Sequence, residues 1–172
     1  MTVYVALLRA INVGGTGLLS MVDLKAICSG LGFADVATYI QSGNVVFRSA
    51  LTETEVLARL EAALCERMGR PTGMLLRDAA EMQAVAGRSP FANAEPSKVL
   101  ITFLPAPPPA DALDRLVAPG GERVVVTGRE IFIHYPDGSG RSKLKLPFLA
   151  TGTARNLNTV RKLAAMAAAA EG

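Results

Sequence analysis

The sequence predicts an α+β fold, with a ferredoxin-like split βαβ unit in the N-terminal half and a second, related α+β unit after it. Half of the 172 residues are hydrophobic, which is enough to bury a core. Short apolar runs with β-branched residues alternate with apolar residues at helical spacing. In the first half these segments follow the order strand, helix, hairpin, helix, strand, which is the order of a ferredoxin-like unit.

The first half begins with residues 3–8, a continuous apolar run that predicts a strand buried on both faces. A helix is expected after Ser20, which suits an N-cap, and Gly32 suits the end of that helix. Residues 38–47 predict an antiparallel hairpin, because two β-forming runs meet there at the polar turn of residues 42–44.

A second helix is predicted between Thr52, which forms a capping-box pattern with Glu55, and Gly69. Residues 74–77 complete the unit as its fourth strand. Asp78 is then expected to begin a further helix, because it starts a similar capping pattern.

Residues 89–96 contain two prolines and are typical of a linker, so the predicted domains are residues 1–88 and residues 97–172. The second domain is expected to repeat the order strand, helix, hairpin. Its strand is residues 99–104, and its hairpin turns at Gly128.

Two helices are predicted in the second domain. A short helix after the prolines is expected to carry Leu113, Leu116 and Val117. Residues 160–170 predict an alanine-rich helix, since alanine has the highest helix propensity.

The net charge of +3 is too small to indicate a polyanion partner by itself, but its distribution is uneven. Residues 1–128 contain 11 basic and 12 acidic side chains, whereas residues 129–172 contain 7 basic and 3 acidic ones. The excess of positive charge therefore lies in the last quarter of the chain.

The cysteine and histidine content argues against a structural zinc site, since Cys28, Cys65 and His134 cannot supply its four ligands. Both cysteines fall in predicted helices and suit buried thiols in a reducing compartment. The N-terminus lacks a signal-peptide pattern, and nothing approaches 18 consecutive apolar residues. We therefore expect a cytoplasmic protein with no metal and no membrane contact.

Cofactor and nucleophile motifs are weak. Residues 15–20 match a dinucleotide fingerprint except at its last position, but a hairpin follows where a nucleotide-binding unit would continue with a parallel strand and a helix. No cofactor is therefore predicted. Ser142 beside Lys143 is not expected to form a catalytic pair, because neighbouring strand residues point to opposite faces. The sequence leaves open whether the protein is an enzyme.

Two polar segments near the C-terminus predict a site for a small anionic ligand. The turn at residues 138–140 can offer backbone N–H groups, and it is followed by Arg141, Ser142 and Lys143. The start of the last helix, where the helix dipole is positive, carries Arg155, Asn156, Asn158 and Thr159. The alternative is that these arginines pair with the protein's own carboxylates and that Asn156 caps the helix.

The N-terminal half contributes further candidate contacts, namely Arg9, Asn12, Gln41 and Asn44. They belong to the same site only if the open end of the first hairpin faces the C-terminal segments.

Four motifs, in this order along the chain, resemble the bacterial domain-of-unknown-function 1697 family: residues 7–15, 39–45, 140–144 and 155–160. The resemblance spans nearly the whole chain and implies a two-part α+β protein. It carries no catalytic assignment. Leu157 stands where the family often has tryptophan, and this difference removes an aromatic surface for stacking.

Three other functions are considered. Nucleic-acid binding is not favoured, because ferredoxin-like RNA-binding sheets use exposed aromatic residues, and the predicted strands lack such a motif. A non-catalytic module could form a homodimer through its sheets or its alanine-rich helix. An enzyme acting on a small anionic substrate is the third alternative, although the sequence offers no clear acid–base pair.

Overall fold

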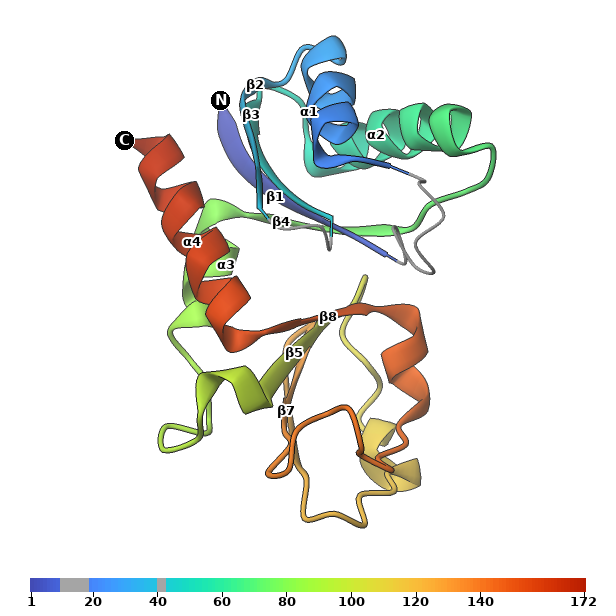
Figure 1. Cartoon of the computed structure of the whole chain (residues 1–172), viewed down its shortest axis with the longest axis vertical. Helices are drawn as coiled ribbons and strands as arrows, with labels where there is room; N and C mark the ends of the chain where they lie inside the picture. Colours follow the sequence, from blue (N-terminus) through green and yellow to red (C-terminus); the bar gives the residue numbers. More distant parts are fainter. Residues whose placement is uncertain (10–18, 40–42) are drawn as a thin grey trace. The chain divides into compact units, whose positions relative to one another are not determined.

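The chain forms two compact units (Figure 1). The computed structural model describes residues 1–9, 19–39 and 43–172. Residues 1–83 and 163–172 make up the first unit, and residues 84–162 make up the second. Each unit contains one four-stranded antiparallel sheet, so the fold is α+β, as predicted. Within the described ranges, no helix has the length and apolar character needed to cross a membrane.

The first unit has the predicted ferredoxin-like topology. Its elements are β1 (Thr2–Leu8), α1 (Met21–Gly30), β2 (Ala34–Tyr39), β3 (Asn44–Ser49), α2 (Glu53–Met68), β4 (Met74–Asp78) and α3 (Ala79–Ala86). The strand order is β2-β3-β1-β4, and every neighbouring pair is antiparallel. Because α1 and α2 connect strands of one sheet and lie on the same side of it, they cover one of its faces (Figure 1).

Strand β1 lies inside this sheet, and every residue from Val3 to Leu8 is buried. Alternate residues of the strand belong to the core that α1 and α2 cover. In that core, the rings of Phe33 and Phe47 stack with their centroids 4.4 Å apart. The prediction of a strand buried on both faces is therefore confirmed.

Helix α2 begins with the predicted capping box. The Thr52 backbone N–H donates to Glu55 Oε2 (2.9 Å), and the Glu55 backbone N–H donates to Thr52 Oγ1 (3.3 Å). The helix ends at Gly69, whose φ of 73° places it in the left-handed region that favours glycine.

We expect Thr52→Ala to lower the free energy of unfolding by about 1 kcal/mol, because the first turn of α2 loses a side-chain acceptor. Chemical denaturation measures this change. Thr54→Ala is the matched control, since Thr54 is exposed within the first turn and alanine favours helix there. Equal stability of the two variants would show that the cap contributes nothing.

The second unit repeats this strand order with shorter helices. Its elements are β5 (Val99–Phe103), β6 (Arg123–Thr127), β7 (Glu130–His134), β8 (Thr153–Asn156), the start of α4 (Leu157–Glu171), and 3-10 helices at Pro96–Lys98, Ala112–Arg115 and Pro147–Thr151. The sheet order β6-β7-β5-β8 is that of the first sheet when β5 to β8 are equated with β1 to β4. The predicted relationship between the two units is confirmed.

A buried arginine occupies the same position in both sheets. Arg77 pairs with Val5 of β1, and Arg155 pairs with Ile101 of the equivalent strand β5. Each guanidinium donates from Nη1 to the carbonyl of the residue before it. A helix follows each of these strands directly. The repeat therefore extends from strand order to individual side chains.

Two predictions for the second unit are wrong. The segment expected to form a short helix with Leu113, Leu116 and Val117 contains only the 3-10 helix Ala112–Arg115, and Leu113 and Val117 are 36% and 50% exposed. The last helix was expected to begin at Val160, but α4 begins at Leu157, directly after residues 153–156, which form the edge strand β8. The division between the units also differs from the predicted domains, since residues 163–172 group with the first unit.

Candidate functional site

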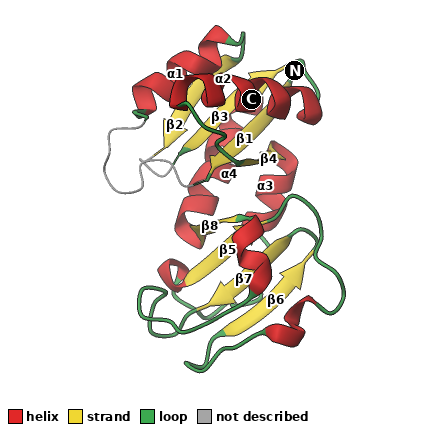
Figure 2. Cartoon of the chain, turned by 90° about the vertical axis from the view of Figure 1, so that its right-hand side faces the viewer, coloured by secondary structure: helices red, strands yellow, loops and turns green. Residues whose placement is uncertain are grey.

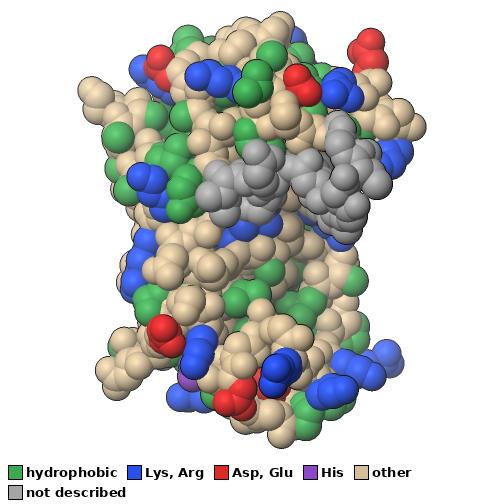
Figure 3. Space-filling view, viewed as in Figure 1, with side chains coloured by type: hydrophobic (Ala, Val, Ile, Leu, Met, Phe, Trp, Pro, Cys, Tyr) green, Lys and Arg blue, Asp and Glu red, His purple; other side chains and the backbone are tan. Residues whose placement is uncertain are grey.

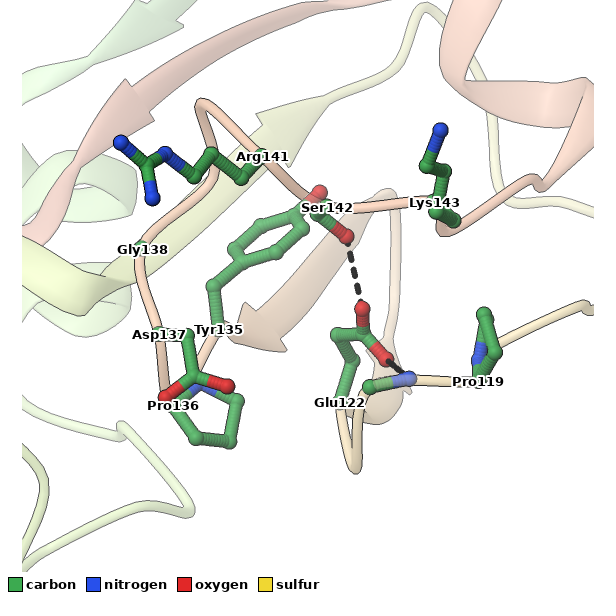
Figure 4. A pocket seen from close by; sticks show the side chains of 10 residues that line it. Pro119, Glu122, Tyr135, Pro136, Asp137, Gly138, Arg141, Ser142 and Lys143 are labelled. Atoms are coloured by element: carbon green, nitrogen blue, oxygen red, sulfur yellow. Dashed lines mark hydrogen bonds between the residues drawn. The ribbon is translucent and has the colours of Figure 1, made fainter.

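A pocket of about 360 Å³ lies in the second unit, between the segment before β6 and the segment after β7 (Figure 4). We call it the hairpin-end pocket. It is lined by Pro119, Gly120, Glu122, Tyr135, Pro136, Asp137, Gly138, Arg141, Ser142 and Lys143. Because Arg123 of β6 pairs with His134 of β7, the chain before one strand and the chain after the other lie side by side at this end of the hairpin.

Glu122 is held by two hydrogen bonds at one wall of the pocket. The Ser142 hydroxyl donates to Oε1 (2.7 Å), and the Gly120 N–H donates to Oε2 (2.7 Å), as Figure 4 shows. The bond from Ser142 is the main cause that lowers the pKa of Glu122 from its ordinary value, so the carboxylate is ionised at neutral pH. Ser142 Oγ also accepts from the Leu144 N–H (3.1 Å). Ser142, predicted as a ligand contact, therefore serves to fix Glu122 and its own turn.

Tyr135 provides a buried aromatic surface in the pocket. Its backbone N–H donates to the Lys98 carbonyl (2.9 Å), which extends the pairing of β7 with β5. Burial raises the pKa of its phenol, and the nearby charge of Glu122 acts in the same direction. Tyr135 is therefore neutral at physiological pH and can pack against an apolar group.

Arg141 and Lys143 supply positive charge at the pocket. Both residues are exposed, and within the described part of the chain neither forms an ion pair or a side-chain hydrogen bond. Figure 4 shows Glu122 turned toward Ser142, while the charged ends of Arg141 and Lys143 point away from that carboxylate. These two predicted contacts therefore remain available to an anion.

The second predicted group, at the start of α4, does not line the hairpin-end pocket. Arg155 is buried, and its Nη1 donates to Thr153 Oγ1 (2.8 Å) and to the Ala154 carbonyl (2.9 Å). Burial lowers the pKa of its guanidinium to about 10. Asn156 Oδ1 accepts from the Thr159 N–H (2.9 Å) and caps α4.

Asn158, the fourth residue of that group, is exposed in the first turn of α4. Asn156 therefore caps the helix, which was the alternative to its binding a ligand. Arg155 bonds a hydroxyl and a carbonyl of its own strand, so the expectation that this group is held open for an anion receives no support from its geometry.

The candidates from the N-terminal half belong to the first unit or lie outside the described residues. Asn44 is fully buried, and its Nδ2 donates to the Tyr39 carbonyl (2.9 Å), which closes the hairpin. The Arg9 N–H donates to the Gly73 carbonyl (2.8 Å). Asn12 and Gln41 are outside the residues that the structure describes.

Sequence reasoning missed Glu122, Tyr135 and Asp137 as members of the site. The signal that could have found them is the pair of turn sequences that flank the hairpin, Pro119-Gly120-Gly121 and Pro136-Asp137-Gly138. The segment before the first strand of a hairpin lies beside the segment after its second strand, so these two turns must be close together. For the described residues, no cluster of three or more His, Cys, Asp or Glu side chains could hold a metal ion.

The face drawn in Figure 3 gives little indication of a polyanion partner. On the face drawn in Figure 3, Lys and Arg side chains lie scattered among acidic and apolar ones. Nucleic-acid binding usually uses a basic patch or stripe, so this face does not strengthen that alternative.

Fold and site together define a two-unit α+β protein with ferredoxin-like topology in both sheets and a small pocket in the second unit. The chain belongs to the family described as "Protein of unknown function (DUF1697)", whose match covers residues 1–132. The resemblance to this family is therefore confirmed over residues 1–132.

A solved structure has the same fold over almost the whole chain. It is the conserved bacterial protein SP0830 from Streptococcus pneumoniae, which is 24% identical and has a TM-score of 0.79. The alignment covers 96% of this chain and 98% of that one. The search of curated proteins finds no match.

Proposed function

We propose that this protein binds a small ligand carrying a phosphate or carboxylate group in the hairpin-end pocket. One observation carries the proposal: Arg141 and Lys143 are exposed beside the pocket and have no partner within the described residues. Charge-assisted hydrogen bonds to such an anion contribute roughly 1.5 to 3 kcal/mol each, less where water competes.

The walls of the pocket restrict the ligand further. Tyr135, Pro119 and Pro136 offer apolar surface, so a ligand with a flat or apolar part gains more than a free anion. Glu122 and Asp137 also line the pocket and repel a second negative group. We therefore favour a ligand with one anionic group, such as a single phosphate or carboxylate, attached to an apolar body, over a polyphosphate.

We propose binding rather than a reaction. The Ser142 hydroxyl, the nucleophile candidate nearest in sequence to Lys143, donates to Glu122, and Glu122 is also bound by a backbone N–H. Groups held in this way fix the shape of the loops that carry Arg141 and Lys143.

An NMR titration with inorganic phosphate, a sugar phosphate and a nucleoside monophosphate tests the proposal. The nucleoside monophosphate is expected to bind most tightly, because it adds a flat aromatic base that can pack against the apolar walls. Arg141→Gln/Lys143→Gln should weaken its binding at least about tenfold, which corresponds to about 1.4 kcal/mol. Raising the salt to about 1 M, where the Debye length is about 3 Å, should weaken wild-type binding as well.

The matched control is Arg161→Gln/Lys162→Gln, which removes the same charge from two exposed residues of α4 outside the hairpin-end pocket. Equal loss of affinity in both double variants would indicate non-specific attraction and overturn the proposed site. Absence of chemical-shift changes around Tyr135 with every probe would also contradict the proposal.

A further inference from the structure

The edge strand β6 has peptide groups that face away from its sheet and have no hydrogen-bond partner among the described residues. The Tyr135 N–H donates to the Lys98 carbonyl, so the residues that bond to β5 are Tyr135, Ile133 and Ile131. The alternate residues of β7, His134, Phe132 and Glu130, bond to β6 on the other side. By register, Arg123, Val125 and Thr127 bond to β7. The N–H and C=O groups of Val124 and Val126 therefore point outward.

No hydrogen bond within residues 1–9, 19–39 and 43–172 engages these outward groups of Val124 and Val126. Figure 2 shows β6 at the margin of the second sheet. The three valines of the strand are each partly exposed. Such a regular edge, whose outward peptide groups belong to uncharged residues and whose charged residue, Arg123, stands at its first position, is a template for pairing with another strand.

The other sheet edges are blunted. The equivalent strand β2 of the first unit has a register shift between Ala34 and Ala37, and Asp35 within it has a φ of 52°. A bulge and a charge of this kind prevent edge pairing. Strand β4 is buried over Met74–Arg77, and β8 has only four residues. Over Val124–Thr127, β6 has neither a register shift nor a charged side chain.

We propose that β6 pairs with β6 of a second copy of this chain, antiparallel and centred on Val125. The strand is self-complementary about that residue: Val124 lies opposite Val126 of the second copy, and Val126 lies opposite its Val124. These are the residues with outward peptide groups, so each of the two pairs exchanges two hydrogen bonds. Arg123 lies opposite Thr127, which keeps like charges apart.

This pairing joins two four-stranded sheets into one of eight strands by a two-fold contact. The contact is five residues long, so we expect a dimer that dissociates on dilution. The two Val125 side chains meet at the two-fold axis as a pair without direct hydrogen bonds, in which side chains are closest.

Sedimentation and amide hydrogen exchange of the full chain, each over a concentration series, test the pairing. The mass should rise toward twice the 18.0 kDa of one chain. Over the same range, the amides of Val124 and Val126 should gain protection from exchange. A constant monomer mass, or exchange of these two amides that does not change with concentration, overturns the proposal.

Charge variants at the axis locate the interface. Val125→Lys and Val125→Glu should each remain monomeric, because like charges then face each other, whereas an equimolar mixture should dimerise. Val125→Thr, which keeps the β-branched shape without charge, should dimerise like wild type. Dimers of Val125→Lys alone, or a mixture that stays monomeric while both variants keep the wild-type fold, would overturn the β6 interface. If a variant fails to fold, the exchange of the wild-type amides decides.

Discussion

Gly152→Ala is expected to lower the free energy of unfolding by at least about 3 kcal/mol, the upper part of the range for overpacking. A Cβ atom at Gly152 would lie 2.1 Å from the Phe103 carbonyl oxygen and 2.9 Å from Thr102 Cγ2. The carbonyl belongs to the backbone of β5, so it cannot turn aside as a side chain would. β8 must move away from β5 to admit the methyl group, and their pairing weakens.

Thermal unfolding should show this loss as a fall in Tm of about 6 to 12 °C, given about 2 to 4 °C per kcal/mol for a chain of this size. Gly140→Ala is the control: its Cβ would meet nothing within 4 Å, and we expect a change within about 0.5 kcal/mol. Equal Tm values for Gly152→Ala and Gly140→Ala would contradict this prediction. They would mean that β8 can move away from β5 to admit the methyl group without loss of stability.

The elements that sequence predicted correctly are those encoded by neighbouring residues. Ser20 and Thr52 accept hydrogen bonds from backbone N–H groups three positions later, so each helix start is decided within one turn. The hairpin of β6 and β7 depends on Gly128, whose φ of 59° suits a two-residue turn. Such local signals were sufficient to predict the ferredoxin-like order of the first unit.

Strand β8 was missed because its cause is not local. The sequence Thr-Ala-Arg-Asn has no alternation of apolar and polar residues, and its extended form comes from pairing with β5, which places Arg155 opposite Ile101. The buried arginine of β4, Arg77, was missed for a related reason. Its position becomes notable only when the registers of the two sheets are compared.

The candidate site was predicted in part. Arg141 and Lys143 were named because basic residues follow a flexible turn, and both line the hairpin-end pocket. Glu122 lies 20 positions before Ser142, so its hydrogen bond to that hydroxyl could not be read from spacing. Conversely, Arg155 and Asn156 were grouped with the site for their chemistry, whereas they bond to groups in β8 and α4.

Comparison of the two units explains why the pocket lies in the second. The connection between β3 and β4 contains the 16-residue helix α2, which packs three buried residues against its sheet. The equivalent connection between β7 and β8 contains only a five-residue 3-10 helix, and its first part forms the turn with Arg141 and Lys143. The segment that builds core in one repeat is thus available to carry polar groups in the other.

Above pH 9, the first unit is expected to lose stability through Cys28. This thiol lies on the buried face of α1 and is fully buried, and desolvation raises its pKa from 9.0 to about 12. Below pH 9 the thiol is protonated in both the folded and the unfolded chain, so its contribution is fully present. Between pH 9 and 12 only the unfolded chain releases the proton, and the free energy of unfolding falls by up to about 1.4 kcal/mol per pH unit.

Chemical denaturation of wild type and Cys28→Ala across this range isolates the effect. Their difference in unfolding free energy should move in favour of Cys28→Ala as the pH rises, by about 3 kcal/mol over the window, while other alkaline titrations cancel. Cys65→Ala, which removes the half-buried thiol of α2, is the control for the loss of a cysteine as such. A difference between wild type and Cys28→Ala that is independent of pH would mean that the folded chain admits water to Cys28, and that the core beneath α1 is looser than its packing indicates.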